Sequence, residues 1–217
     1  MSEPVVRDLN QELRFPLWLL RTEEFAALRR ASPLAVRVLL CVWAHGHGYR
    51  TICYPGEKRI AGLCKTSVSS VSALIRLVEQ AGWLDVRRQR ERGEGNVYRL
   101  QVPVTLRATA DRIQAWLEGP VSGTEPAPVV EGVVMAGDLW GQAGKGRRRQ
   151  RFARISLAEV NSDTWDLLWR TDSVAGHLWL MLQAYSASKE QLSLARLGRE
   201  LKVRPSAVSS ALARLRR

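Results

Sequence analysis

The sequence has few cysteines and no long apolar run. Its 217 residues include three cysteines, Cys41, Cys53 and Cys64. This odd number argues for reduced thiols rather than a disulfide framework. The longest apolar stretches, such as 34–44, are interrupted by Arg37 and are shorter than the roughly 20 residues that a transmembrane helix needs. Residues 1–4 lack the basic and apolar pattern of a secretory signal. We therefore expect a cytoplasmic protein with no contact to membrane.

Paired metal-ligand spacings are also missing. Cys41 and His45 lie four residues apart on a predicted helix, with His47 and Cys53 nearby, and could form a zinc site. The sequence contains no C-x-x-C pair, however. We interpret Cys41 and Cys64 as small core residues and predict neither a metal nor a cofactor.

A catalytic constellation is likewise missing. Asp163, Asp166 and Asp172 are close in sequence, but they flank Trp165 and the pair at 167–168 in a pattern typical of an amphipathic helix and its caps. A nuclease or recombinase needs metal-binding carboxylates, or a nucleophile with its base. We find no such set and predict that the chain is not an enzyme.

Acidic residues are outnumbered by basic ones. Lys and Arg total 33 against 21 Asp and Glu, which gives a net charge of +12. This imbalance favours a polyanionic partner, either nucleic acid or an anionic membrane. Because no membrane-spanning segment is found, nucleic acid is the better candidate.

Residues 32–48 read as a buried helix. Ser32 and Pro33 are typical of an N-cap and a first helical position, and Leu34, Val38 and Val42 recur at helical spacing. Glycines at 46 and 48 are stop signals.

Residues 57–80 read as two helices joined by a tight turn at 64–66, with Ser67 as the cap of the second helix. An apolar stripe on the second helix predicts its buried face; it consists of Val71, Leu74, Ile75 and Val78. The outward positions would be Val68, Ser69, Ser72, Ala73 and Arg76. Small side chains with one arginine suit entry into the major groove.

A hairpin follows this helix. Residues 83–86 and 96–102 read as its strands, and 91–95 as its loop. Four arginines would decorate it: Arg87, Arg88, Arg90 and Arg92. A short amphipathic helix is then expected at 105–119.

Composition changes at 119–128, which is rich in Gly, Pro and Ser and predicts a linker. The linker ends in a basic run at 145–151 that includes Arg147, Arg148 and Arg149. This run is either an arm that contacts phosphates or a solvated, flexible segment.

The pattern of the first half returns after Arg151. Arg14 and Phe15 are echoed by Arg151 and Phe152, and the helix that begins at Ser32 is echoed from Asp172. The closing stretch, from Leu197 on, reads as a second helix-turn-helix whose outward and flanking residues are Arg204, Pro205, Ser206, Ser209, Ser210, Ala213 and Arg214. No residues remain there for a hairpin. Two antiparallel helices of a bundle are the alternative interpretation.

The segment from Ile60 through Ser67, Val71 and Val78 to Leu84 resembles the winged helix-turn-helix domains of bacterial regulators and of phage and plasmid replication proteins. Such domains usually carry glycine where Lys65 stands and a Thr-Val pair where Ser70 and Val71 stand. The tandem arrangement is similar to that of plasmid replication initiators with two winged-helix domains.

The resemblance implies a mainly α fold with a small β-hairpin wing, built as two helix-turn-helix domains of which the second lacks a C-terminal wing. We expect an N-terminal segment at 1–13, a winged-helix domain at 14–104, a helix, linker and basic arm at 105–150, and a second domain at 151–217.

The expected function is sequence-specific binding of double-stranded DNA, as a plasmid or phage replication initiator that binds origin repeats. A transcriptional regulator and a protein-interaction adaptor are the alternatives. The expected partners are DNA, replication or transcription machinery and a second copy of the chain. The expected DNA-binding residues are Lys65, Ser67, Ser69, Ser70, Ser72, Arg76, Arg87, Arg88, Arg90, Arg92, Arg147, Arg148, Arg149, Arg204, Ser206, Ser209, Ser210 and Arg214. The sequence does not choose between direct repeats, bound by two tethered domains, and an inverted repeat, bound by a homodimer.

Overall fold

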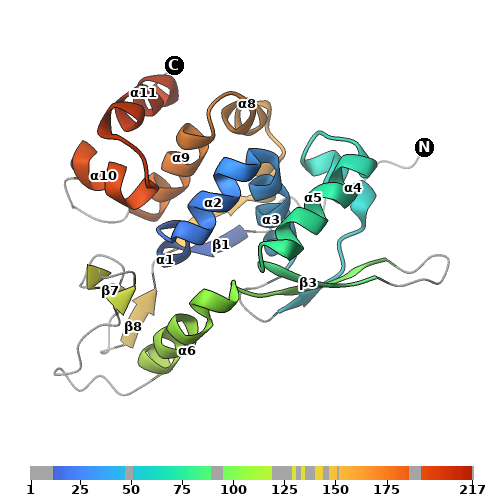
Figure 1. Cartoon of the computed structure of the whole chain (residues 1–217), viewed down its shortest axis with the longest axis horizontal. Helices are drawn as coiled ribbons and strands as arrows, with labels where there is room; N and C mark the ends of the chain where they lie inside the picture. Colours follow the sequence, from blue (N-terminus) through green and yellow to red (C-terminus); the bar gives the residue numbers. More distant parts are fainter. Residues whose placement is uncertain are drawn as a thin grey trace.

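A computed structural model describes residues 12–46, 51–88, 95–118, 129–130, 133–134, 140–143, 147–150, 152–185 and 192–216. This part of the chain is mainly helical, with small antiparallel sheets between the helices (Figure 1). The predicted mainly α composition with a small β component is therefore confirmed.

The first half, which we define as residues 12–118, begins with a strand and three helices. These are β1 (Glu12–Pro16), α1 (Leu17–Leu20), α2 (Glu23–Ala31) and α3 (Pro33–His45). It continues with β2 (Ile52–Cys53), α4 (Glu57–Leu63), α5 (Val68–Gln80), β3 (Leu84–Arg87), β4 (Val97–Leu100) and α6 (Val104–Glu118).

Local capping explains where these helices begin. The side chains of Thr22, Ser32 and Ser67 accept hydrogen bonds from the backbone N–H three residues further on. Each thereby satisfies one of the amide groups that a helix leaves without a partner in its first turn. Pro33 occupies the first turn of α3, as predicted.

The segment between the halves contains two short hairpins. Strands β5 (Val129–Val130) and β6 (Val133–Val134) pair with each other, as do β7 (Trp140–Ala143) and β8 (Arg147–Gln150). The run predicted as either a phosphate-contacting arm or a solvated, flexible segment forms a paired strand here: β8 contains Arg147, Arg148 and Arg149, and its backbone groups pair along the ladder with β7. Residues 119–128 of the predicted linker lie outside the described part.

The second half, residues 152–216, repeats the order of the first. Its elements are β9 (Phe152–Ser156), α7 (Leu157–Val160), α8 (Asp163–Thr171), α9 (Ser173–Tyr185), α10 (Leu194–Leu201) and α11 (Pro205–Leu215). The first four begin at 152, 157, 163 and 173, and their counterparts begin at 12, 17, 23 and 33, a constant offset of 140. Helices α10 and α11 begin at 194 and 205, 137 positions after α4 and α5 at 57 and 68.

This offset confirms the predicted repeat and corrects one of its details. The sequence pairing of Arg14 and Phe15 with Arg151 and Phe152 is shifted by three residues. The element bounds instead make Arg154 the counterpart of Arg14 and Ile155 the counterpart of Phe15. The local Arg-Phe match misled because strand position, not residue type, aligns the two copies.

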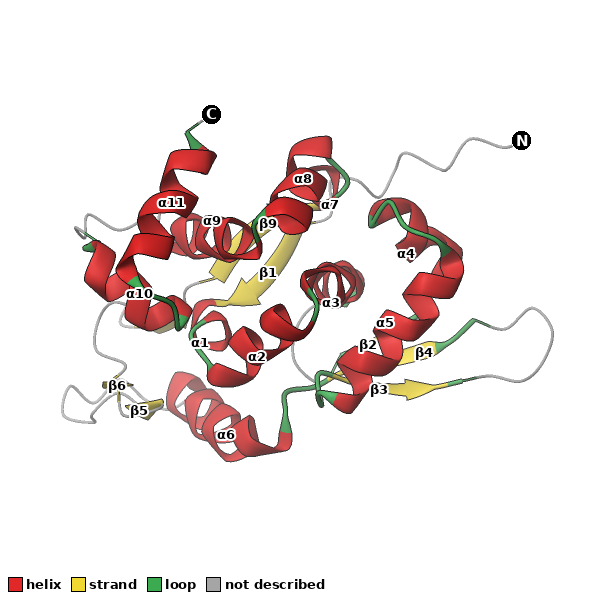
Figure 2. Ribbon diagram, turned by 45° about the horizontal axis from the view of Figure 1, so that its top comes forward, coloured by secondary structure: helices red, strands yellow, loops and turns green. Residues whose placement is uncertain are grey.

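The two halves pack into one body. Strand β1 pairs antiparallel with β9, and buried residues from both halves form a single core cluster. Figure 2 shows this two-stranded sheet in the middle, with α3 and α9 beside it and the two ends of the molecule formed by α4–α5 and α10–α11. Buried residues of β1 and α1 from the first half and of α9 from the second half belong to this one cluster, and α1 packs on α9.

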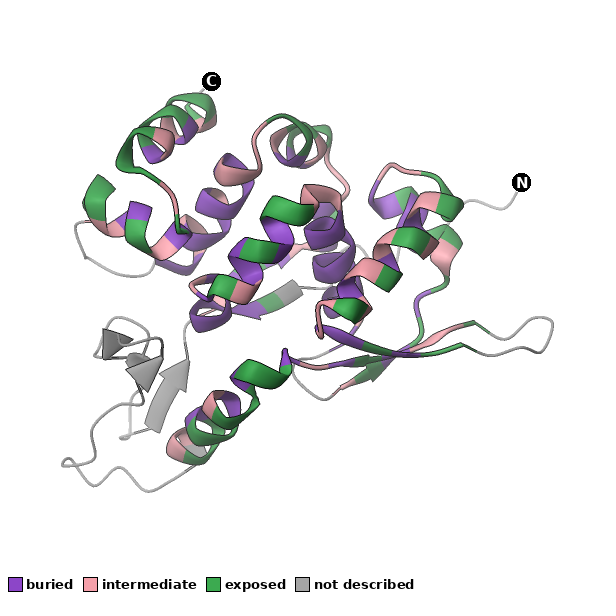
Figure 3. Ribbon diagram, viewed as in Figure 1, coloured by how far each residue is buried: buried purple, intermediate pink, exposed green. Residues whose placement is uncertain are grey.

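The helix faces that turn toward the middle of the molecule are buried (Figure 3), and the core contains several fully buried aromatic residues. The ring centroids of Phe15 and Trp43 are 4.8 Å apart. The ring centroid of Phe25 lies 4.9 Å from that of His177 in the second half. The three cysteines are buried and free, which confirms Cys41 and Cys64 as core residues.

Within the described part, no single helix is long and apolar enough to cross a bilayer. No group of three or more His, Cys, Asp or Glu side chains in that part is arranged to hold a metal ion. His47 of the zinc hypothesis lies outside the described residues, and the ring Nδ1 of His45 is 2.7 Å from the carbonyl oxygen of Cys41 in its own helix.

Candidate nucleic-acid interface

Helices α4 and α5, which we call the first helix pair, meet at an angle of 97°. The turn between them is closed by backbone hydrogen bonds from Lys65 N to Gly62 O (3.2 Å) and from Thr66 N to Ala61 O (3.0 Å). Lys65 has a φ of 49°, in the left-handed region where glycine is usual. The angle lies within the 90–120° or so that is typical of helix-turn-helix motifs.

Helix α5 divides its side chains as predicted, except that Ser72, which was expected to face outward, is half-buried. Val71, Ile75 and Val78 are buried against the core, and Leu74 is half-buried. The exposed side chains are those of Val68, Ser69, Ala73, Arg76 and Gln80. The exposed face is therefore lined by small side chains, with one guanidinium group a little over two turns from its start.

Serine hydroxyls gather at the beginning of α5. Ser67 Oγ lies 2.9 Å from Ser69 Oγ and 2.8 Å from Ser70 Oγ, and it accepts a hydrogen bond from Ser70 N at 3.1 Å. Ser72 is half-buried and donates its hydroxyl proton to Glu57 of α4. Of the four serines predicted in α5 and its cap, Ser67 and Ser69 are the exposed ones.

The predicted hairpin is present as β3 and β4, and β2 adds a third strand beside β4. Val86, Tyr98 and Leu100 point to the core, and Arg87 and Arg99 are exposed. Burial raises the pKa of Tyr98 to about 12, so its hydroxyl stays protonated.

The hairpin is tied to the first helix pair by polar contacts. Asn96 Nδ2 donates to Glu57 Oε1 at 2.8 Å, and Arg88 Nη2 lies 2.6 Å from Glu79 Oε2 of α5. The Glu79 hydrogen bond raises the pKa of Arg88. Arg88 therefore positions the hairpin against α5. Arg90 and Arg92 lie outside the described residues.

Helices α10 and α11 form the second helix pair. Its turn contains Lys202 with a φ of 54°, the counterpart of Lys65. Val208 and Ala211 are buried, and the predicted outward residues are all exposed: Arg204, Pro205, Ser206, Ser209, Ser210, Ala213 and Arg214. Arg214 is partly engaged, because its Nη1 lies 3.2 Å from Asp172 Oδ2.

Four further exposed residues were not predicted as part of the site. Tyr54 and Arg99 lie on the outer face of the three-stranded sheet, where they line a shallow hollow with Arg87. Arg199 and Lys202 line a second hollow at the turn of the second helix pair. The alternation of apolar and polar residues around Tyr98 could have indicated that Arg99 is exposed. The two hollows could not be predicted in this way, because they depend on how distant elements pack.

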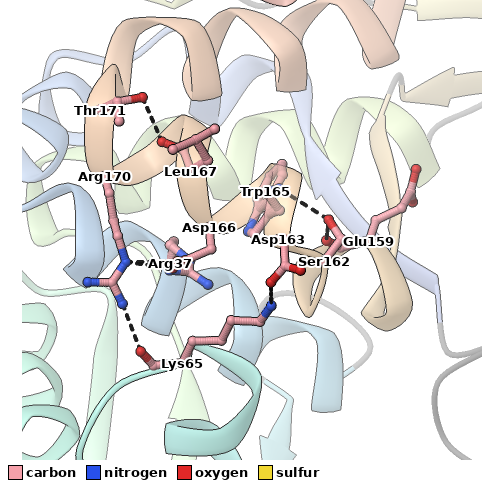
Figure 4. Close-up of polar contacts among 10 residues, drawn as sticks. All are labelled: Arg37, Lys65, Glu159, Ser162, Asp163, Trp165, Asp166, Leu167, Arg170 and Thr171. Atoms are coloured by element: carbon pink, nitrogen blue, oxygen red, sulfur yellow. Dashed lines mark hydrogen bonds and ion pairs between the residues drawn. The ribbon is translucent and has the colours of Figure 1, made fainter.

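The turn of the first helix pair also contacts the second half (Figure 4). Arg170 Nη2 of α8 donates to the carbonyl oxygen of Lys65 at 2.7 Å, and the Lys65 side chain pairs with Asp163. Asp166 accepts from Arg170 Nε at 2.8 Å and pairs with the buried Arg37 of α3. Helix α8 therefore holds the turn in place from the other half of the molecule.

Two of the three aspartates of this region, Asp166 and Asp172, have structural roles. Burial alone would raise the pKa of Asp166, but the hydrogen bonds from Arg170 and Arg37 outweigh burial and hold it below its usual value. Asp172 caps α9 by accepting from Val174 N at 3.0 Å and Ala175 N at 3.1 Å. The interpretation of this cluster as an amphipathic helix with its caps is confirmed.

No family model, no curated protein and no solved structure matches the chain.

Proposed function

We propose that the chain binds double-stranded DNA in a sequence-specific manner and that its first helix pair with the β3–β4 hairpin acts as a winged helix-turn-helix. One observation carries this proposal: α5 has an exposed face of small side chains and Arg76, held at 97° to α4 beside an arginine-bearing hairpin. This is the arrangement in which the second helix of such a motif enters the major groove.

The exposed face of α5 has suitable chemistry for reading base pairs. Ser69 and Ala73 are small enough to let the helix approach the floor of the groove, and the Ala73 methyl group can contact a thymine methyl group. Arg76 can donate two hydrogen bonds to the O6 and N7 atoms of guanine, the most common specific contact in the major groove. A serine hydroxyl accepts and donates, so it discriminates weakly between bases.

Phosphate contacts would supply much of the affinity. Arg87 and Arg99 are exposed on the hairpin, Lys58 is exposed on α4, and the whole chain carries a net charge of +12. Each phosphate contact releases condensed counterions, so six to ten such contacts would weaken binding about a thousand-fold or more between 50 and 200 mM salt. A salt slope near zero on duplex DNA would contradict this part of the proposal.

We propose replication initiation at a plasmid or phage origin as the biological role, by binding alone and without catalysis. Two helix pairs in one chain support this role. Footprinting on the source genome tests it: protection of an array of short repeats beside an AT-rich stretch is expected, and protection of a single promoter site would identify a transcriptional regulator.

The DNA-binding proposal is tested by a matched pair of substitutions. Ala73→Glu places a carboxylate on the exposed face of α5, and Ala108→Glu makes the same change on the exposed face of α6. On a duplex selected from random sequences, we expect Ala73→Glu to weaken binding at least a hundred-fold and Ala108→Glu less than threefold, with unchanged circular dichroism for both. Equal effects of the two changes would refute recognition by α5.

A further inference from the structure

We infer that this single chain is an internal dimer that binds one inverted repeat with its two helix pairs. The inference rests on the proposed DNA binding and adds the geometry of the target: two half-sites of opposite orientation, at a fixed spacing, bound by one copy of the chain.

The pairing of β1 with β9 carries the symmetry argument. The two strands are counterparts in the repeat and run antiparallel, with Glu12 opposite Ser156 and Pro16 opposite Phe152. At the centre of the ladder Arg14 lies opposite Arg154, its own counterpart. Equivalent strands that pair antiparallel about equivalent residues are related by a two-fold axis through that pair, as in a symmetric dimer.

Contacts between the halves repeat on both sides of this axis. Helix α1 packs on α9, and its counterpart α7 packs on α3. Arg29 Nη2 of α2 donates to the carbonyl oxygen of Leu201, at the end of α10, at 3.1 Å. Arg170 of α8 makes a similar contact, one position later in both the helix and the turn, with the carbonyl oxygen of Lys65, just after the end of α4. Each helix pair is therefore held at its turn by an arginine from the opposite half.

The arrangement of the whole molecule agrees with this axis. In Figure 2 the two helix pairs lie at opposite ends of the molecule, α2 and α8 lie on opposite sides, and the β1–β9 sheet lies between them. A two-fold axis of the protein that coincides with a dyad of DNA presents the two helices to inverted half-sites.

The spacing between half-sites is fixed because the halves share a core. The Nε2 atom of the buried His177 lies 2.7 Å from the carbonyl oxygen of Leu20 in the other half. Arg37 of the first half pairs with Asp166 of the second. Changing the angle between the helix pairs would break these buried contacts. If the spacing between the half-sites is changed by half a turn of DNA, the two helix pairs can therefore no longer bind both half-sites at once.

The two half-sites are related but not identical. The exposed Ser69 has Ser206 as its counterpart at the offset of 137, whereas Arg76 corresponds to Ala213. The position read by this serine should be shared by the half-sites. The guanine contact expected of Arg76 should be present in the first half-site only.

Binding is measured on duplexes that carry the selected site in four forms: inverted half-sites, the same half-sites as direct repeats, one half-site alone, and the inverted pair with five or ten added base pairs. We expect one chain per inverted duplex by native mass spectrometry, and at least thirty-fold weaker binding to every other form. Ala213→Arg should then raise affinity about tenfold for a perfect palindrome of the first half-site, and Ala108→Arg should not.

Equal affinity for the inverted pair and a single half-site would overturn the inference, as would two chains on the inverted duplex or one chain that bridges two separate duplexes. These outcomes leave the proposed DNA binding intact. A chain that binds no duplex at all contradicts the proposed function itself.

Discussion

Arg37 is a charged side chain in the interior, and among the described residues it forms an ion pair with Asp166 of the other half. Its side chain has no exposed surface, and that of Asp166 is 19% exposed. Among the described residues, Nε and Nη2 of Arg37 have no hydrogen-bond partner. The guanidinium group therefore depends on one carboxylate to offset the loss of its hydration.

Removal of that carboxylate should be costly. Asp166→Asn leaves a buried cation without its counter-charge, and we expect a loss of about 2–4 kcal/mol in the free energy of unfolding, slightly below the range for fully buried pairs. Asp163→Asn is the control on the same helix, because its side chain is 98% exposed and its pair with Lys65 should contribute almost nothing. Urea denaturation compares them; similar effects of the two changes would contradict this account.

His177 gives the stability a pH dependence. Burial lowers its pKa to about 3, so the folded chain keeps it neutral at pH values where the unfolded chain binds a proton. The free energy of unfolding should therefore fall as the pH drops below about 6.5, by roughly 1.4 kcal/mol per pH unit from this residue. In His177→Gln, which still offers an N–H to Leu20, the decline between pH 6.5 and 5 should become shallower. An unchanged slope would be inconsistent with a buried neutral imidazole.

At the scale of elements, the turns of the two helix pairs share an unusual backbone conformation. Lys65 and Lys202 are the only non-glycine residues of the described part with positive φ. A residue with a Cβ atom pays about 1–2 kcal/mol for this conformation. At these equivalent positions both the turn geometry and the lysine are repeated.

Substitution of Lys65 should reflect this conformation. Lys65→Val adds a branched side chain at positive φ and should destabilise the chain by about 1–2 kcal/mol, whereas Lys65→Gly should change stability by less than about 1 kcal/mol, because relief of strain offsets the flexibility of glycine. Lys58→Val on the exposed face of α4 controls for the loss of lysine. Thermal unfolding measures the relative stabilities of these variants. If Lys65→Val were as stable as Lys65→Gly, the prediction would be refuted.

The elements of the first helix pair could be predicted because short-range signals determine them. Ser67 is a cap, Val71 and Ile75 recur at helical spacing, and the alternation around Tyr98 indicates a strand. The strand at 147–150 could not be predicted, because a run of arginines has the composition of a solvated arm and becomes a strand only by pairing with β7. The roles of Arg88 and Ser72 also escaped prediction, since both depend on glutamates from other helices.

At the scale of the whole molecule, the repeat could be predicted from the sequence, but the packing of the two copies against each other could not. Similar patterns after residue 151 indicated a second copy, but nothing local shows that β1 pairs with β9 or that α9 packs on α1. Such contacts join residues about 140 positions apart, and chain patterns at the scale of one helix or strand carry no information about them. The division of the chain into domains at 14–104 and 151–217 stays a prediction. The two halves share one hydrophobic core.

A common core should unfold as one unit. Leu178 of α9 is fully buried, and Leu178→Ala should cost about 2–5 kcal/mol. We expect the entire denaturation curve to shift, with tryptophan fluorescence and circular dichroism giving the same midpoint. Two separate transitions, of which only one moves, would indicate halves that fold independently.

The central claim is that the exposed face of α5 reads base pairs in duplex DNA, and Arg76 tests it most directly. Binding-site selection from random duplexes should be performed with the unmodified chain, with Arg76→Ala and with Arg112→Ala as an exposed arginine control on α6. We predict that Arg76→Ala loses the preference for guanine at one position, a discrimination of about 1–3 kcal/mol, and retains the others. A selected sequence that is the same for all three proteins would contradict the claim.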